Sequence, residues 1–299
     1  MSDVLVTGYT GFIGTAVTKE LLSRGWRVTG ISRKSMLPQH ESLTQVNLDL
    51  LDLSAVERFF SANSFEAMLH LAWYLGPKCH VHDINMDWLA VSLHLLRCFQ
   101  QAGGRIFQAN GTVSEYDFSF GCLSEEKTPL NNASLHGQCK AALYHTAQAF
   151  CGQHGMTFKW PRVFNLYGPG ERTSRLVPSV ILSALRGEDI KVSECLQIQD
   201  YLHVADTAAG IVEVFESDAA GAVNICSGTP VRLRSIVESL VELTSFHGNV
   251  LWGAIPGALE FPLIVGSNQK LRSLGWAPRV SLQDGLKQTI AWWRKQYVS

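Results

Sequence analysis

Three glycines near the start of the chain have the spacing of a phosphate-binding turn. Gly8, Gly11 and Gly14 form the pattern GxxGxxG, which follows an apolar run at 3–7 and opens a helical pattern. In such a turn the first glycine allows a sharp bend, the second admits backbone amides close to a pyrophosphate, and the third lets the helix pack against the strand. The sequence therefore predicts a dinucleotide site formed by Gly8, Thr10, Gly11, Phe12, Ile13 and Gly14.

The end of the second predicted strand, at 26–31, indicates which dinucleotide is bound. NAD-specific sites usually place an acidic residue here for the ribose hydroxyls, but this chain has Ser32, Arg33 and Lys34. Hydroxyl, guanidinium and ammonium groups attract the 2′-phosphate of NADP, whereas a carboxylate would repel it. We therefore expect NADP(H), with NAD(H) as the alternative cofactor. The competing interpretation is that the two basic residues are solvated loop charges.

Further cofactor contacts are expected where other strands end. Asp49 follows a predicted strand at 43–48 and is placed to accept a hydrogen bond from the adenine amine. Its alternative role is to cap the helix predicted at 53–61.

The elements that would position these residues alternate along the first half of the chain. Because parallel strands need crossover connections, this alternation predicts an α/β fold with a doubly wound parallel (Rossmann) sheet. The expected strands are 3–7, 26–31, 43–48, 66–71, 105–110 and 157–164, and the expected helices are 12–24, 53–61, 82–101 and 134–153.

Beyond Gly170 the alternation loosens, which indicates a smaller C-terminal lobe. Helical patterns remain at 176–186, 231–243 and 281–296. We expect a dinucleotide-binding domain at 1–165, to which later segments near 200–228 return. The remainder, mainly 166–299, is expected to bind the substrate.

The composition excludes several classes of protein. With 46% hydrophobic and 17% charged residues and a net charge of −1, the 299-residue chain has no basic excess for nucleic acid or a membrane surface. No apolar run approaches the ~20 residues that span a bilayer, and a strand begins where a signal peptide would stand. Seven scattered cysteines are typical of reduced thiols in a cytoplasmic protein. The scattered histidines and cysteines form no metal-ligand pattern, so we expect no metal.

Seven motifs follow one another along nearly the whole chain. They are GYTGFIG at 8–14, HLA at 70–72, GTVSEYD at 111–117, HGQCK at 136–140, PRVFNLYGP at 161–169, DYLHVAD at 200–206 and LRSLGWAP at 271–278. These motifs resemble those of the extended short-chain dehydrogenase/reductase family, which includes nucleotide-sugar epimerases, dehydratases and 4-ketoreductases. The segment at 111–117 is most similar to sugar 4-ketoreductases and related deoxysugar enzymes. The resemblance implies that the cofactor site is completed by Leu50, Leu71, Ala72, Lys140 and Val163.

The resemblance implies a reaction centre of Thr112, His136 and Lys140. In the family, a lysine holds the nicotinamide ribose and lowers the pKa of a tyrosine four residues earlier, which transfers a proton to or from the substrate oxygen. A serine or threonine polarises that oxygen. Thr112 and Lys140 match this pattern, but His136 stands at the tyrosine position, on the same helix face as Lys140.

Three interpretations of His136 remain open. It is the acid/base group, because imidazole titrates near neutrality and Lys140 would lower its pKa. Alternatively, Thr112 and Tyr116 transfer the proton while His136 only shapes the pocket. In the third interpretation the reaction centre is lost, and the chain is a catalytically degenerate dinucleotide-binding regulatory protein.

The substrate side also departs from the family pattern. Asn165 matches an asparagine that contacts the nucleotide diphosphate in the family, but Gln199 stands where an arginine is expected. Arg172 and Arg175 in the loop after Gly170 are candidate replacements, with ordinary surface charge as the alternative. Trp73 and Tyr74, which follow the strand predicted at 66–71, have two open interpretations: they stack on a sugar face, or they are buried in the core. The expected substrate-binding set is Trp73, Thr112, Tyr116, Asn165, Arg172 and Arg175.

The leading functional hypothesis is therefore an NADP(H)-dependent oxidoreductase that reduces a keto group of a nucleotide-linked deoxysugar. The alternatives are an NAD-dependent nucleotide-sugar epimerase or dehydratase and the non-catalytic protein described above. The expected partners are a small-molecule substrate and a second copy of the chain. The helices predicted at 82–101 and 134–153 carry apolar stripes that would join a homodimer. The stripes consist of Leu89, Leu93 and Leu96 on the first helix and Ala141, Ala142 and Ala149 on the second.

Overall fold

A parallel sheet forms the centre of the computed structural model, which describes residues 3–33, 36–131, 133–257 and 261–298. Lys34 lies outside this range. The strand order β12-β8-β5-β4-β1-β2-β3, with β6 paired to β8, confirms the predicted Rossmann architecture. The strands are β1 (Asp3–Thr7), β2 (Arg27–Ser32), β3 (Leu43–Asn47), β4 (Ala67–His70), β5 (Ile106–Ala109), β6 (Gly111–Thr112), β8 (Thr157–Val163) and β12 (Gly221–Ile225).

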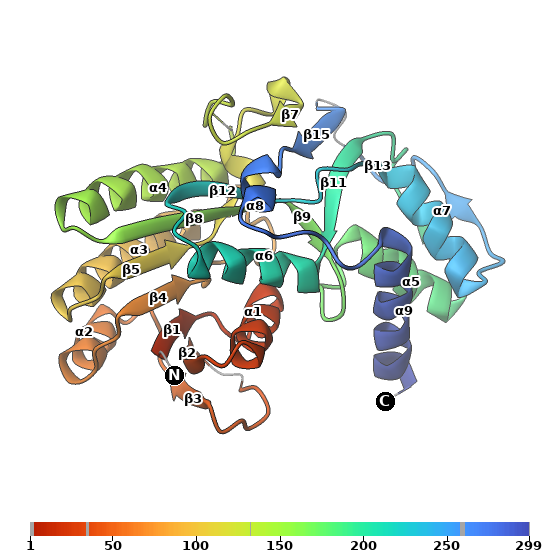
Figure 1. The fold of residues 1–299 in the computed structure, drawn as a ribbon. Helices are drawn as coiled ribbons and strands as arrows, with labels where there is room; N and C mark the ends of the chain where they lie inside the picture. Colours follow the sequence, from red (N-terminus) through yellow and green to blue (C-terminus); the bar gives the residue numbers. More distant parts are fainter. Residues whose placement is uncertain (1–2, 34–35, 132, 258–260, 299) are drawn as a thin grey trace.

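Helices cover both faces of this sheet, so the central strands β1 and β4 are buried on both sides (Figure 1). Side chains alternate between the faces: Val4 and Val6 of β1 pack beneath one helix layer, whereas Leu5 packs beneath the other. The first layer is formed by α1 (Phe12–Ser23) and α6 (Val204–Glu216). The second is formed by α2 (Leu53–Ala62), α3 (Ile84–Gln101) and α4 (Leu135–Gln153).

The chain returns to the main sheet late, through α6 and β12. β12 pairs with β8, and α6 packs against α1. Lys159 of β8 is buried and donates hydrogen bonds to the carbonyls of Val214, Phe215 and Ser217 at the end of α6. An ammonium group stabilises the negative end of a helix dipole, so Lys159 fixes this end of α6 on the sheet.

The smaller lobe lies beyond the carboxyl ends of the main strands (Figure 1). Its hydrophobic core is shared by α5 (Leu176–Arg186), α7 (Leu233–Thr244) and α9 (Leu282–Val298). Its strands are β7 (Cys122–Leu123), β9 (Asn165–Tyr167), β10 (Ile190–Lys191), β11 (Ile198–His203), β13 (Pro230–Arg232), β14 (Val250–Leu251) and β15 (Leu263–Gly266). Three further helices are short: η1 (Val113–Glu115), which contacts α4, η2 (Phe118–Phe120), and α8 (Gln269–Ser273), which contacts β12.

The predicted elements are found with their ends shifted by at most two residues, but two details are corrected. Asp52, not Asp49, caps α2, because its carboxylate accepts the Ala55 amide at 3.0 Å. In the apolar stripes of α3 and α4, Leu96 and Ala141 face the core and cannot contribute to a dimer interface. In the described part of the chain, no helix has the length and apolar character needed to cross a membrane.

Candidate functional site

The glycine turn after β1 has the geometry of a phosphate-binding loop. Gly8 has a φ of +70°, and a Cβ there would lie 2.8 Å from the Ala72 backbone. A Cβ at Gly14 would overlap the carbonyl oxygen of Gly8. Gly11 is exposed at the start of α1, and no side chain caps that helix. The residues present therefore fit the pyrophosphate of a dinucleotide, which would meet the free amides and positive potential of α1.

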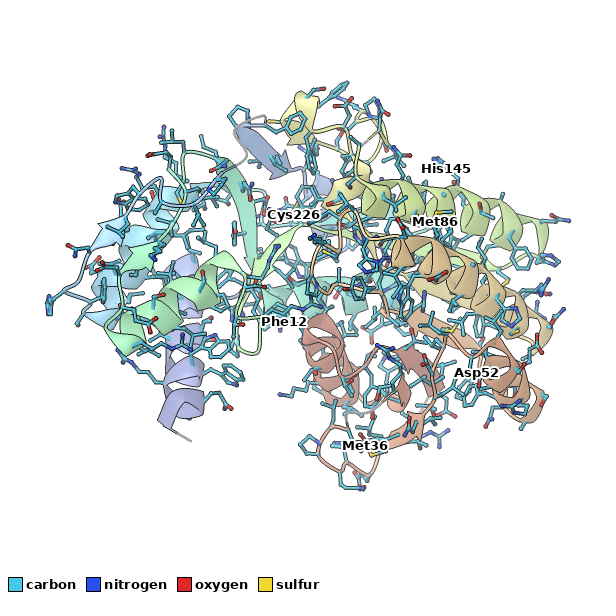
Figure 2. The ribbon with its side chains drawn as sticks, turned by 180° about the vertical axis from the view of Figure 1, so that it is seen from behind. Phe12, Met36, Asp52, Met86, His145 and Cys226 are labelled. Atoms are coloured by element: carbon cyan, nitrogen blue, oxygen red, sulfur yellow. The ribbon has the colours of Figure 1, made fainter. Side chains whose placement is uncertain are left out.

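Figure 2 shows Phe12, the first residue of α1, near the middle of the molecule, where the two lobes meet. Ala72, after β4, lies beside the glycine turn, and its amide approaches Thr7 Oγ1 at 3.4 Å. Leu71 and Ala72 are half-buried, whereas the Val163 side chain is in the hydrophobic core. Contacts to a dinucleotide from Val163 would therefore have to come from its backbone.

The end of β2 presents a half-buried Ser32 and an exposed Arg33. Beneath it, the Tyr9 ring lies against Gly30, where a Cβ would meet the ring at 2.5–2.7 Å. The Tyr9 hydroxyl donates to Gln45 Oε1 at 2.7 Å. Next to β3, Asp49 is exposed and accepts the Leu51 amide at 3.1 Å, while the predicted cofactor residue Leu50 has its side chain in the core.

Thr112 lies in a rigid turn at the end of the main sheet. Its amide donates to Glu115 Oε1 at 2.7 Å, and its Oγ1 accepts the Ser114 amide at 3.2 Å. Glu115 is fully buried and forms an ion pair with Arg162 at 2.7 Å. Because Oγ1 already accepts a bond, the hydroxyl proton of Thr112 is left to donate to a substrate oxygen.

Lys140 of α4 is buried beside this turn. Its Nζ donates to the carbonyl oxygen of Asn110 at 2.8 Å and lies 3.9 Å from the centre of the Trp73 ring. Burial lowers the pKa of Lys140 to about 7, against a smaller opposing effect of Glu115. Asn110 also has a buried Oδ1 without a hydrogen-bond partner in the described structure. This atom is an acceptor available to a hydroxyl or amide group of a ligand.

His136, one helical turn before Lys140, is held by Asn85. The Asn85 amide nitrogen donates to the carbonyls of Cys79 and His82, both at 2.7 Å, which turns its Oδ1 toward His136. That oxygen accepts from Trp73 Nε1 at 2.9 Å and lies 3.1 Å from His136 Nδ1. Since Oδ1 can only accept, His136 carries its proton on Nδ1.

The electrostatics of His136 limit what the imidazole can do. Burial, followed by the charges of Lys140 and His80, lowers the pKa of His136 to about 3. The ring is therefore neutral at physiological pH, and its Nε2 is a hydrogen-bond acceptor. An imidazolium that donates a proton, one form of the acid/base interpretation, is disfavoured by this environment.

Backbone contact brings the Thr112 turn and α4 together. Gly137 follows His136, and a Cβ at this position would overlap the carbonyl oxygen of Ser114 in η1. Only glycine permits this approach, so the start of α4 is seated directly on the turn that Thr112 caps. The predicted reaction-centre residues are thus carried by two elements in direct contact.

Two predicted substrate residues have different surroundings from those expected. Tyr116 has no exposed surface, and its hydroxyl donates to Asn224 Oδ1 at 2.7 Å and accepts from Arg162 at 3.1 Å. Burial raises its pKa above the usual value. In this structure Tyr116 therefore has no exposed surface to offer a substrate. Trp73 does lie beside the reaction centre, but one ring face covers Lys140 rather than open space.

Across from the reaction centre, β9, β11 and the loop before α5 carry the remaining predicted residues. Asn165 donates to Gln199 Oε1 at 3.1 Å, so these two side chains are paired as a neutral unit. Arg172 and Arg175 are exposed. Burial, followed by the charge of Arg175, lowers the pKa of His80, which packs edge-on against His136 with ring centres 5.9 Å apart. Arg175 thus lies near the reaction centre.

Sequence reasoning missed Asn85, Asn110 and Glu171. Asn110 directly follows β5, two residues before Thr112, so its place at a strand end could have indicated a site residue. Asn85 lies in the first turn of a predicted helix, and nothing in the sequence distinguishes it from other polar helix residues. Glu171 adjoins a candidate arginine, but the burial that gives it chemical interest is visible only in the fold.

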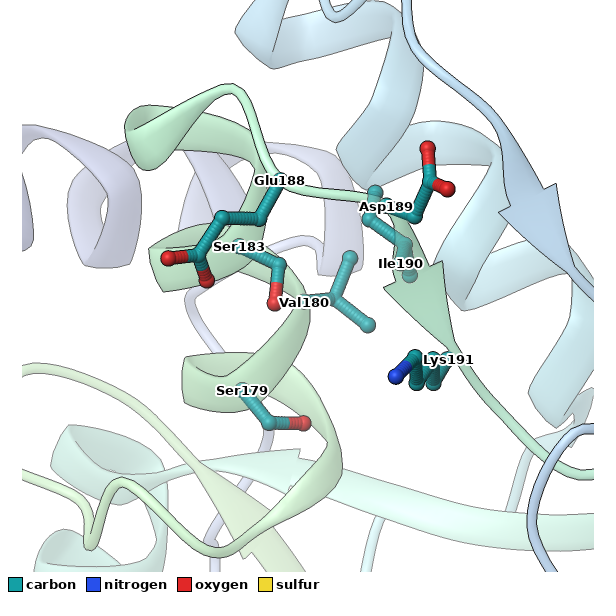
Figure 3. Close-up of a pocket in the computed structure, with 7 residues that line it drawn as sticks. All are labelled: Ser179, Val180, Ser183, Glu188, Asp189, Ile190 and Lys191. Carbon is teal, nitrogen blue, oxygen red and sulfur yellow. The ribbon is translucent and has the colours of Figure 1, made fainter.

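Two hollows lie in the smaller lobe. One, of about 410 Å³, is bordered by α5 and β10, including Ser183 and Asp189 (Figure 3). The other, of about 240 Å³, adjoins Cys195 and Gly257. Neither is lined by the Thr112, His136 or Lys140 side chains, so both are separate from the reaction centre.

Comparison with known proteins gives a consistent picture. The profile of the NAD dependent epimerase/dehydratase family matches residues 4–226. GDP-L-fucose synthase 1 of Arabidopsis thaliana is 28% identical over alignments that take in 99% of this chain and 95% of that protein. The dTDP-6-deoxy-L-talose 4-dehydrogenase (NAD(+)) of Aggregatibacter actinomycetemcomitans is 26% identical, over 80% and 89% of the two chains.

Among solved structures, the UDP-glucose 4-epimerase of Thermus thermophilus in complex with NAD is 25% identical and superposes with a TM-score of 0.86. The match covers 98% of this chain and 99% of the epimerase.

Proposed function

The chain belongs to the NAD dependent epimerase/dehydratase family, as its motifs indicated, and from this premise we propose that it is an NADP(H)-dependent oxidoreductase that reduces a keto group of a nucleotide-linked deoxysugar. The observation that carries the proposal is the seating of the Thr112 turn on α4 beside the Lys140 ammonium. This arrangement offers a hydroxyl donor and a titratable cation at the carboxyl ends of the sheet strands, where parallel sheets bind ligands. Relatives that bear the names of a fucose synthase and a talose 4-dehydrogenase support a deoxysugar substrate.

In the proposed reduction, the cofactor, Thr112 and Lys140 have separate roles. NADP(H), when bound, supplies the hydride to the carbonyl carbon. Thr112 donates its hydroxyl proton as a hydrogen bond to the carbonyl oxygen and so stabilises the developing negative charge. Lys140 is partly protonated near pH 7 and supplies the proton that the new alkoxide takes up, directly or through a water.

His136 has a positioning role in this proposal. With Nδ1 bound to Asn85, its neutral Nε2 accepts a hydrogen bond from a substrate hydroxyl or from a water. Imidazole is shorter than a phenol, so a water fits between the ring and the reacting oxygen. This assignment keeps His136 at the site without requiring the charged form that burial disfavours.

The preference for NADP(H) rests on the residues after β2. Ser32 and Arg33 offer a hydroxyl and a guanidinium where an acidic residue would select NAD. Arg33 is exposed and thus accessible to a 2′-phosphate. The relatives' names include NAD, so this preference is a specific property proposed for this chain.

The test is to follow the absorbance of NADPH with a panel of nucleotide-linked 4-keto deoxysugars, made in situ from several nucleotide sugars. We expect net oxidation of NADPH with at least one of them and a markedly lower rate for the Thr112→Val variant. An epimerase would instead convert its substrate without net loss of NADPH. Absence of any conversion, together with retained dinucleotide binding, would favour the non-catalytic alternative.

A further inference from the structure

Glu171 is a buried carboxyl group that the proposed reaction does not use. It lies in the loop between β9 and α5, is 6% exposed, and its Oε2 has no hydrogen-bond partner in the described structure. An unpartnered buried oxygen is costly, and a bound ligand is one way in which such an atom is satisfied. Burial, only partly offset by Arg175, raises the pKa of Glu171 to about 8. The carboxyl group is therefore largely protonated at neutral pH.

Arg175 is the cation nearest to this carboxyl. Its Nε lies 3.7 Å from Glu171 Oε1, beyond hydrogen-bond distance, and its side chain is half-exposed. Arg175 also stands at the start of α5, which no side chain caps. A cation, an open helix N-terminus and a carboxyl proton thus meet at one place, and each of them favours an anionic oxygen.

The surroundings indicate that this place faces the substrate. Burial raises the pKa of Tyr201, on β11, to about 12, and the charges of Arg175 and Glu171 also act on this group. Burial, followed by the charge of Arg175, lowers the pKa of His80, which in turn packs against His136. On β11, Gln199 is neutral and paired with Asn165, and burial lowers the pKa of His203. The ionisable groups on these elements are Arg172, Arg175, Asp200, Tyr201, His203 and His80.

We propose that Glu171 and Arg175 together bind the diphosphate of the substrate, Glu171 as a protonated carboxyl that donates its O–H to a phosphate oxygen and Arg175 as the cation. This inference rests on the proposed function, since that function supplies the nucleotide-linked substrate. Ionised Glu171 would repel the diphosphate and attract Arg175 away from it. Binding is therefore strong below the pKa of Glu171 and weakens as the pH rises through it.

Calorimetric titration tests this without turnover, using UDP-glucose, dTDP-glucose and GDP-mannose as probes whose diphosphates keep their charge between pH 6 and 10. We expect at least one probe to bind at pH 7 and its Kd to rise about tenfold per pH unit above pH 8. The Glu171→Gln variant retains an N–H donor and is expected to bind without this pH dependence. Arg175→Gln should weaken binding by roughly 10- to 100-fold, since a hydrogen bond to a charged group is lost.

The matched control is Glu188→Gln, which changes an exposed glutamate paired with Arg186 at the other end of α5. It should keep the pH dependence of the natural chain. An unchanged pH dependence in Glu171→Gln, or no binding of any probe at any pH, would overturn the proposal. If a probe binds as expected but no keto sugar is reduced, the reductase function fails while this site stands. If a keto sugar is reduced but binding of the probes does not depend on pH, the reductase function stands and the proposed diphosphate site fails.

Discussion

Replacement of Arg162 by methionine should destabilise the protein strongly, because it leaves Glu115 as an unpaired buried charge. Arg162 is 1% exposed and Glu115 is fully buried, with Arg162 Nε 2.7 Å from Glu115 Oε2. Removing one partner of such a pair costs about 3–5 kcal/mol in the free energy of unfolding. That corresponds to a roughly 10²- to 10⁴-fold fall in the ratio of folded to unfolded chains.

The structure also predicts which second change restores stability. Glu115 accepts hydrogen bonds from the Thr112 amide and from Trp160 Nε1, as well as from Arg162. Glu115→Gln, added to Arg162→Met, removes the uncompensated charge but keeps an oxygen for these two donors. We expect the double variant to regain most of the lost stability.

The assay is urea unfolding followed by far-UV circular dichroism. The control is Arg27→Met, which removes the cation of a surface pair with Asp3 whose side chains are 56% and 51% exposed. Pairs of this kind contribute up to about 1 kcal/mol. If Arg162→Met costs no more than this control, the buried ion pair does not stabilise the Thr112 turn as argued.

Four further predictions concern the cofactor, the reaction, the pH dependence of stability and the assembly. Arg33→Asp should reverse the preference for NADPH over NADH, measured as the ratio of kcat/KM values, and equal ratios before and after the change would refute the assignment. The kcat of keto reduction should fall as the pH rises through about 7, where Lys140 loses its charge, and Lys140→Arg should lose this fall because guanidinium does not titrate there. Stability should fall as the pH drops below 6.5, because buried His70 and His136, both with pKa values lowered to about 3, stay neutral while the unfolded chain takes up protons. At pH 5 the loss in the free energy of unfolding is about 2 kcal/mol per histidine, and His136→Phe should reduce this loss in urea titrations. Ala142→Glu, on the exposed face of α4, should convert the expected dimer to monomers in sedimentation, whereas an already monomeric natural chain would contradict the dimer.

The α3–α4 surface itself agrees with that expectation only in part. Figure 2 shows Met86 on α3 and His145 on the neighbouring α4, and both side chains are exposed. Met86 is 55% exposed. The predicted stripe on α3 combined the half-buried Leu89 and Leu93 with Leu96, which lies in the core. Helical periodicity identifies an apolar face but does not distinguish a face that meets the sheet from one that meets a partner.

The sequence predicted the elements well because its signals are local. β1 and the glycine turn were identified from apolar residues and glycine spacing, and the sheet follows from the alternation of strands with helices. Thr112 and Lys140 were identified from their motifs, and the structure places them on two elements in direct contact. The failures arise where a side chain's surroundings decide its chemistry: nothing in the sequence shows that Tyr116 reaches Asn224, more than a hundred residues away, or that Asn85 fixes the proton of His136.

Gly137 has a consequence for how this reaction centre tolerates change. Because α4 and η1 meet backbone to backbone there, their spacing does not depend on the size of any neighbouring side chain. Position 136 can then exchange one ring for another while Thr112 and Lys140 keep their places. His136→Tyr would enter a frame that is already assembled, whereas Gly137→Ala would separate the two elements. Gly137, which has no side chain, is thus a position whose replacement the site should tolerate poorly.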